Sequence, residues 1–263
     1  AFAPVNVVRN HFTPDLKRID EPSRLLLLDL GQGKERLGGS VLAQVYNLVG
    51  GFAPDIDVPA SLKSFFDVVQ MLLKQNLVLA YHDRSDGGLL TTISEMMFAG
   101  HLGVSLRLSG SAEKVIRYLF NEELGGVIQV AESQIGAVKD VLESQQMHWV
   151  DIGEVSADEQ LTVYNDDEII YRSGRVQLQR IWSETSYHIQ SLRDNPDTAL
   201  EEYDRILDAE DPGMNVSLSF DLSDTETAFK IGATKPRVAI LREQGVNSQY
   251  EMAAVFMRAG FEA

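Results

Sequence analysis

Residues 77–103 read LVLAYHDRSDGGLLTTISEMMFAGHLG, and this stretch decides the fold. The apolar run that ends at Asp83 predicts a buried strand, because it is too short for a helix. The apolar residues that follow have the spacing of an amphipathic helix that ends at Gly100: Leu89, Leu90, Ile93, Met96 and Met97. Between strand and helix lie Asp83, Ser85, Asp86 and two glycines. Such a turn brings carboxylates, backbone N–H groups and a positive helix end together, which suits a phosphate and its metal.

Similar apolar runs alternate with helical patterns on both sides of this stretch. Residues 24–30, RLLLLDL, are a continuous apolar run before Gly31 and predict a buried strand. Further strands are expected at 104–108, 127–130 and 149–155, and helices at 41–49, 62–73, 115–119 and 134–144. The alternation predicts an α/β (α+β) layered domain rather than a helical bundle.

The loop after the first strand carries glycines and one lysine. Gly33 and Lys34 suggest a phosphate loop, but the glycine spacing is wrong and no Ser or Thr follows Lys34, so we reject that interpretation. Ser40 is expected to cap a helix, and Ser61 to cap the next one. The expected core face of the first helix is Val41, Leu42, Val45, Leu48 and Val49. The alternative is a backbone contact with a substrate at the helix start.

The pattern changes after residue 160. Residues 161–164 and 169–171 flank an acidic turn and predict a hairpin, and a helix is expected at 178–192. We therefore expect a first domain at 1–160, a closing hairpin and linker at 161–234, and a new domain at 235–263.

The last of these regions begins with a predicted strand, Arg237 to Leu241. Ser248 and Glu251 have the spacing of a capping box at the start of a helix that ends at Gly260. A single strand and helix cannot cover both faces of a parallel strand, so we expect a fragment of a longer polypeptide.

The composition excludes several classes of protein. The formal charge of −16 and the absence of a basic cluster argue against nucleic-acid binding. The acidic residues concentrate at 194–211 and 221–226, which predicts a solvated surface rather than a metal-binding tail. No apolar run is long enough to span a membrane, no signal segment is visible, and there is no cysteine. We expect a cytoplasmic location.

The stretch HDRSDGGLLTTISEMMFAGHLGV resembles the signature of the C-terminal ATP-binding module in the aminoimidazole ribonucleotide (AIR) synthetase-like superfamily. Within it, the chain most resembles the large single-chain phosphoribosylformylglycinamidine synthase family. Three more stretches resemble this family and follow one another in the order that the family has: LGGSVLAQVY at 37–46, FNEELGGVIQV at 120–130, and KPRVAILREQGVNSQYEMAAVFMRAGF at 235–261. By this resemblance, residues 1–160 are the second synthetase C-terminal domain and 235–263 the truncated start of a class I glutamine amidotransferase.

The resemblance implies a carbon–nitrogen ligase of purine biosynthesis. ATP activates the amide oxygen of formylglycinamide ribonucleotide, and ammonia from glutamine replaces it. It implies that Asp83 is a Mg²⁺ ligand, that Ser85 binds the nucleotide phosphate, and that an upstream synthetase module completes the ATP site. We assign no catalytic residue. The amidotransferase nucleophile is a downstream cysteine in that family, so we expect no glutaminase activity from these 263 residues.

Structural alternatives accompany the assigned residues. Asp83 could close a loop or pair with Arg84, and Asp86 before two glycines is typical of a helix cap. Glu122 and Glu123 could approach the nucleotide, shape an interface, or stand at a helix end without a chemical role.

Two histidines flank the predicted helix. His82 is interpreted as a strand residue with ordinary hydrogen-bond partners, and His101 as a surface or capping residue. Neither is expected to bind metal.

Two other functions compete with the ligase. One is another ATP-dependent member of the superfamily, such as thiamine-monophosphate kinase or selenophosphate synthetase. The other is a non-catalytic nucleotide-binding or interaction module. Residues 242–247, REQGVN, favour the ligase, because those relatives carry no amidotransferase.

Overall fold

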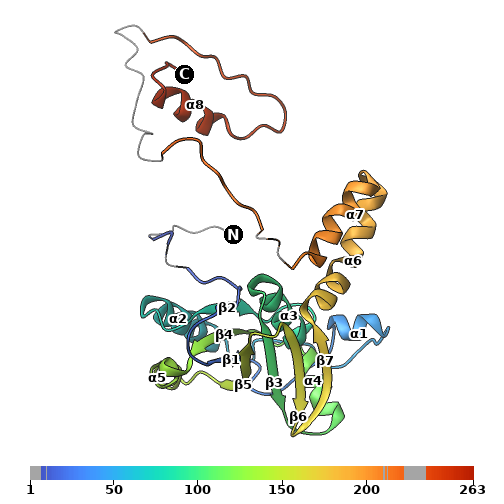
Figure 1. The fold of residues 1–263 in the computed structure, drawn as a ribbon. Helices are drawn as coiled ribbons and strands as arrows, with labels where there is room; N and C mark the ends of the chain where they lie inside the picture. The colour runs from blue at the N-terminus through green and yellow to red at the C-terminus, as the bar shows by residue number, and fades with distance from the viewer. Residues whose placement is uncertain (1–6, 10, 210, 212, 222–234) are drawn as a thin grey trace. The chain divides into compact units, whose positions relative to one another are not determined.

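The computed structural model describes residues 7–9, 11–209, 211, 213–221 and 235–263. Its internal contacts divide the chain into two units, Ala1–Ala209 and Glu210–Ala263, and each is described by itself (Figure 1).

The first unit is built on a seven-stranded sheet with the order β2-β4-β1-β5-β3-β6-β7. Its strands are β1 Ser23–Asp29, β2 Ala80–Asp83, β3 Gly103–Leu108, β4 Gly125–Ala131, β5 Trp149–Ser156, β6 Gln160–Asn165 and β7 Glu168–Gly174. Neighbouring strands are antiparallel except β3 and β6, which are parallel. The mixed sheet with its helices confirms the predicted α/β (α+β) class.

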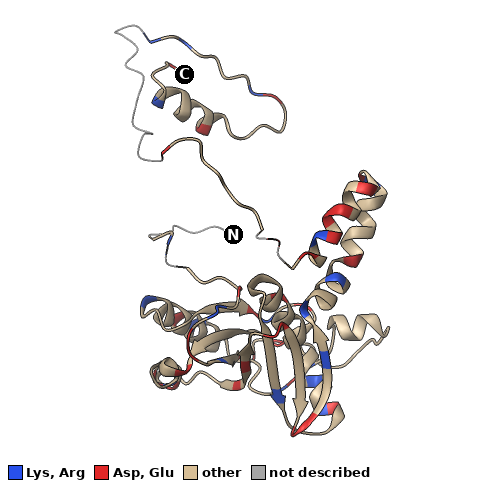
Figure 2. Ribbon diagram, viewed as in Figure 1, with Lys and Arg blue, Asp and Glu red and all other residues tan. Residues whose placement is uncertain are grey.

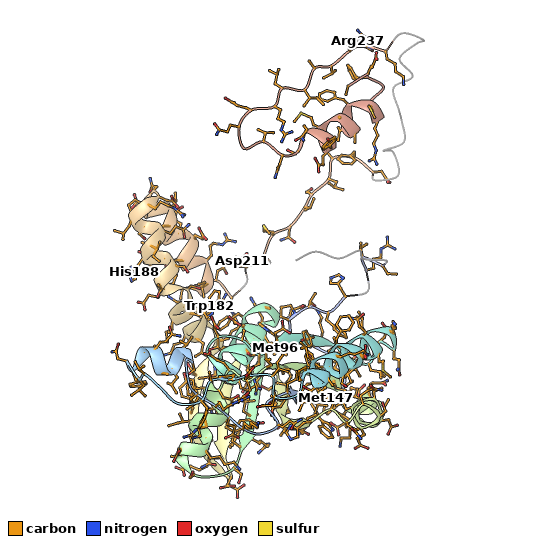
Figure 3. All side chains as sticks on the ribbon, turned by 180° about the vertical axis from the view of Figure 1, so that it is seen from behind. Met96, Met147, Trp182, His188, Asp211 and Arg237 are labelled. Atoms are coloured by element: carbon orange, nitrogen blue, oxygen red, sulfur yellow. The ribbon has the colours of Figure 1, made fainter. Side chains whose placement is uncertain are left out.

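Helices cover both faces of this sheet (Figure 1). They include α2 Pro59–Lys74, α3 Gly88–Gly100, α4 Ala112–Phe120 and α5 Ile135–Ser144. Leu25 and Leu27 of β1 lie in one core cluster with residues of α3 and α4, whereas Leu26 and Leu28 lie in another with residues of α2 and α5. Side chains alternate between the faces of a strand, so a central strand covered on both faces is apolar throughout. This explains why residues 25–28 of β1 are four consecutive leucines. Figure 3 labels one methionine of each cluster, Met96 and Met147.

Of the two predicted helix caps, the one at Ser40 is confirmed and the one at Ser61 is wrong. Ser40 caps α1, Val41–Val45, as predicted, because its hydroxyl accepts the N–H of Ala43 at 3.2 Å. The predicted core face of α1 is wrong: Val45 is 68% exposed, and Ala43 is the buried residue of this five-residue helix. Ser61 is not the cap of α2, because the helix begins two residues earlier at Pro59, whose missing N–H suits a first helical position.

The predicted hairpin is part of the same sheet. β6 and β7 pair antiparallel, and β6 pairs with β3, so the expected boundary at residue 160 falls within one sheet. Two helices follow, α6 Arg175–Arg193 and α7 Pro196–Asp204. They are joined by stacking of Tyr187 on Tyr203, with ring centroids 4.5 Å apart. The carboxylates of α7 are exposed, as predicted for a solvated surface (Figure 2).

In the second unit, the described residues contain α8, Gln249–Arg258, which confirms the predicted helix. The predicted strand is reduced to an isolated parallel bridge between Arg237 and Glu262. The capping box is not formed, because the Ser248 side chain makes no cap hydrogen bond. A lone strand has no neighbour to satisfy its backbone groups, which explains why the bridge does not extend. The acidic residues at 222–226 lie outside the described residues.

Candidate functional site

The turn between β2 and α3 presents the two predicted site residues to solvent. Asp83 ends β2, Ser85 follows in the turn, and both are exposed. The carboxylate of Asp83 accepts a hydrogen bond from the Tyr81 hydroxyl. Burial, followed by this hydrogen bond, raises the pKa of Tyr81 above its ordinary value, so the hydroxyl remains a donor. Asp83 is therefore held in place and still accessible.

Arg84 points away from Asp83. It is buried and forms an ion pair with Asp29 at the end of β1, with Nη2 and Oδ1 2.5 Å apart. Its Nε also donates to the carbonyl oxygen of Glu123. The alternative in which Arg84 pairs with Asp83 is thus wrong.

The start of α3 depends on glycine. Gly87 and Gly88 have φ of 83° and 70°, in the left-handed region. A Cβ on Gly88 would lie 2.7 Å from the carbonyl oxygen of Asn121, so α3 begins in close contact with the end of α4. Asp86 is exposed and makes no cap hydrogen bond, so the prediction that it caps the helix is wrong. The left-handed residue Gly87 occupies that position instead.

Glu122 connects the turn to another helix start. Its Oε1 accepts the N–H of Gly87 at 2.9 Å and the N–H of Val41 at 2.8 Å. The carboxylate thus lies at the N-termini of both α3 and α1, where helix dipoles favour negative charge. Glu122 is therefore a helix-end carboxylate, as one of the interpretations had it, with a structural role at two helix starts. Its partners are 35 and 81 residues away, so no local spacing could reveal them.

We expect Glu122→Ala to lower the free energy of unfolding by about 1–2 kcal/mol, because two helix N–H groups lose their acceptor. Urea denaturation measures this. Glu113→Ala on the exposed face of α4 is the control, since its i,i+4 pair with Arg117 contributes about 0.3–0.5 kcal/mol. Equal losses for both variants would contradict the bridging role.

Glu123 has a structural role. Its side chain is 1% exposed and pairs with Arg36, with Nε and Oε1 2.7 Å apart. This hydrogen bond raises the pKa of the Arg36 guanidinium. The pair attaches the loop after β1 to the end of α4, and Glu123 faces away from solvent.

The histidines have the partners predicted for structural residues. His82 Nε2 lies 3.1 Å from Glu95 of α3, which also accepts from the Trp182 indole of α6 at 3.1 Å. Figure 3 labels Trp182 on that helix. His101 is the exposed C-cap of α3, with φ of 52° and its N–H on the Met97 carbonyl.

The turn exposes two carboxylates that a magnesium ion could use, Asp83 and Asp86. Among the described residues, no three His, Asp or Glu side chains lie close enough together to hold a metal. Mg²⁺ is commonly held by one or two carboxylates, with water and phosphate oxygens completing six positions. The exposed Asp83 carboxylate therefore fits one ligand position of a Mg²⁺ site whose other positions would need further oxygen ligands.

The described helices include none that is long and apolar enough to cross a lipid bilayer.

A two-sided layered domain of this kind defines the class of the protein as α/β with a mixed sheet. Residues 23–166, more than half of the chain, match the family model of the AIR synthase related protein C-terminal domain. The chain therefore belongs to the AIR synthase related family. Residues 235–263 match the model of the CobB/CobQ-like glutamine amidotransferase domain.

Of three similar solved structures, one has a TM-score above 0.5 and two have lower scores. Thermotoga maritima PurL complexed with ATP is 13% identical, with a TM-score of 0.51 over 64% of this chain and 27% of that chain. Phosphoribosylformylglycinamidine synthase II from Thermotoga maritima has 14% identity and a TM-score of 0.49 over the same shares, 64% and 27%. Thiamine-monophosphate kinase from Stenotrophomonas maltophilia has 14% identity and a TM-score of 0.39 over 60% and 54%. The present chain thus spans about a quarter of the length of the first two.

Proposed function

We propose that this chain is a section of a cytoplasmic, ATP- and glutamine-dependent carbon–nitrogen ligase. The reaction converts formylglycinamide ribonucleotide to formylglycinamidine ribonucleotide in purine biosynthesis. The observation that carries the proposal is the presence, in one chain, of an AIR synthase related domain and a glutamine amidotransferase match. A kinase of the same superfamily needs no ammonia, so the second match favours the ligase.

Within this enzyme, the turn between β2 and α3 contributes to the nucleotide site. Asp83 occupies one Mg²⁺ ligand position, and the Ser85 hydroxyl donates to a phosphate oxygen. Mg²⁺ held there would neutralise part of the polyphosphate charge, which phosphoryl transfer from ATP requires. Tyr81 orients the Asp83 carboxylate, and Glu122 fixes the start of α3 behind it. Residues of an upstream synthetase module complete the site.

The same proposal assigns a domain to each part of the chain. Residues 1–160, together with the closing hairpin that completes their sheet, form the synthetase C-terminal domain. The rest of 161–234 is the linker, and 235–263 is the beginning of the amidotransferase domain. The linker contains the ordered pair α6 and α7, which contacts α3 through Trp182 and Glu95. No cysteine is present among the 263 residues, so glutamine hydrolysis needs residues outside them.

An assay of the full-length enzyme tests this function. We expect formylglycinamidine ribonucleotide to form with ATP and either glutamine or free ammonia. Asp83→Asn should reduce turnover with both nitrogen sources, because the loss is in ATP use and not in glutamine hydrolysis. Phosphorylation of thiamine monophosphate, or no turnover of formylglycinamide ribonucleotide with ammonia, would contradict the proposal.

A further inference from the structure

A cavity of about 280 Å³ lies on the side of the sheet covered by α4, separate from Asp83 and Ser85. Its walls come from β1, β3, β5, α4 and the loop after β1. Residues used below that line it are Leu27, Asp29, Glu35, Arg84, Arg107, Lys114, Val115, Tyr118 and Val150. All belong to the first unit.

Some charged groups of this cavity already have partners. Arg84 and Asp29 pair with each other, with Nη2 and Oδ1 2.5 Å apart. Arg107 pairs with Glu154 at 3.2 Å and lies over the Tyr164 ring. These charges are compensated within the protein, so none of them calls for a ligand.

Three other polar groups in the walls make no ion pair or side-chain hydrogen bond among the described residues: the Tyr118 hydroxyl, the exposed Lys114 and Glu35. The Tyr118 hydroxyl is buried and has no hydrogen-bond partner among the residues that the structure describes. In the part of the chain that the structure describes, neither Lys114 nor Glu35 has an ion pair within 4.0 Å. Lys114 and Glu35 act on each other at longer range: burial raises the pKa of Glu35, and the charge of Lys114 lowers it. Of the three, the Tyr118 hydroxyl is the buried group without a partner. Such a group is costly, and in native proteins it commonly faces a water, an ion or a ligand.

The rest of the wall is apolar. Leu27, Val115 and Val150 lie between the polar groups, together with the ring of Tyr118. A site of this composition suits a molecule with an apolar body and few polar groups. The Lys114 ammonium and the Tyr118 hydroxyl can both donate to one carboxylate, and the Glu35 carboxylate beside them can accept from a donor.

We propose that this cavity binds a small organic acid: a carboxylate at Lys114 and the Tyr118 hydroxyl, an apolar body against Leu27, Val115 and Val150, and a hydrogen-bond donor facing Glu35. This site is distinct from the turn at Asp83, and the proposal does not depend on the ligase function.

The test uses the 263-residue chain and three matched probes. 4-Hydroxybenzoate has charge, ring and donor, benzoate lacks the donor, and 4-hydroxybenzamide lacks the charge. Calorimetric titration should find 4-hydroxybenzoate the tightest, with the other two at least threefold weaker. Inorganic phosphate should bind more weakly than 4-hydroxybenzoate, because it has no apolar body.

Variants locate the binding in the cavity. Lys114→Met and Tyr118→Phe should each weaken 4-hydroxybenzoate at least fivefold, and Lys74→Met, which removes an exposed charge from α2, should leave it unchanged. Tyr118→Phe removes only a hydroxyl without a partner, so the chain should fold normally. Equal binding of all three probes, tighter binding of phosphate, or unchanged affinity in Lys114→Met would overturn the proposal.

Discussion

Arg84→Met is expected to lower the free energy of unfolding by about 3–5 kcal/mol. The side chains of Arg84 and Asp29 are 2% and 8% exposed, so the variant leaves a buried carboxylate without its cation. Asp29 would keep the N–H groups of Gly31 and Gly33, at 3.2 and 2.8 Å. It would also keep the half-exposed His148 ring, whose Nδ1 lies 3.5 Å from Oδ2. Two backbone donors do not replace a full positive charge in a medium of low dielectric constant. Chemical denaturation of the variant measures the loss.

The matched control is Arg117→Met, which removes the same side chain from an exposed i,i+4 pair on α4. Its expected cost is about 0.3–0.5 kcal/mol. The double variant Arg84→Met with Asp29→Asn should be less destabilised than the two single changes added together, because neither charge is then left alone. Additive losses would show that the two residues do not act as a pair.

Gly88→Ala is expected to destabilise the first unit by about 2–5 kcal/mol. The backbone at Gly88 has φ of 70°, which costs an alanine about 1–2 kcal/mol. The added Cβ would also lie 2.7 Å from backbone atoms at Phe120 and Asn121, and such overpacking costs about 1–3 kcal/mol. Because both neighbours are backbone, α3 or α4 must move to relieve the contact.

Gly136→Ala is expected to stabilise the protein, in contrast to Gly88→Ala. Gly136 lies in α5, and a Cβ there would meet no atom within 4 Å. Alanine should stabilise that helix by up to about 1 kcal/mol. Thermal unfolding of both variants distinguishes the steric clash at Gly88 from the gain in helix propensity at Gly136. A similar change in Tm for Gly88→Ala and Gly136→Ala would contradict the close contact between α3 and α4.

Local patterns were sufficient for most elements of the first unit. RLLLLDL was predicted as a buried strand because its length and composition are local properties, and β1 confirms it. The core face of α1 was not predictable in the same way. Its apolar residues have helical spacing, but burial depends on which other element covers them, and Val45 remains 68% exposed. The predicted strand at 237–241 was also wrong, because a strand forms only with a neighbour.

The same distinction applies to the candidate site. Asp83 and Ser85 were identified within one short motif, and the structure places both on an exposed turn. The groups that hold this turn come from elsewhere: Glu122 accepts from Gly87 across 35 residues, and Arg84 reaches Asp29 across 55. Neither pairing leaves a periodic signal, so only the three-dimensional fold reveals them.

The central claim is that the turn at Asp83 binds a magnesium-bound nucleotide. Calorimetric titration of the full-length enzyme with Mg-ADP tests it, with Asp83→Ala compared with Asp86→Ala, an exposed carboxylate of the same turn. We predict that Asp83→Ala weakens binding about tenfold or more, the effect of about 1.4 kcal/mol from one lost ligand, while Asp86→Ala binds as the unaltered enzyme does. Equal Mg-ADP affinity in the Asp83→Ala variant and the unaltered enzyme would contradict the claim.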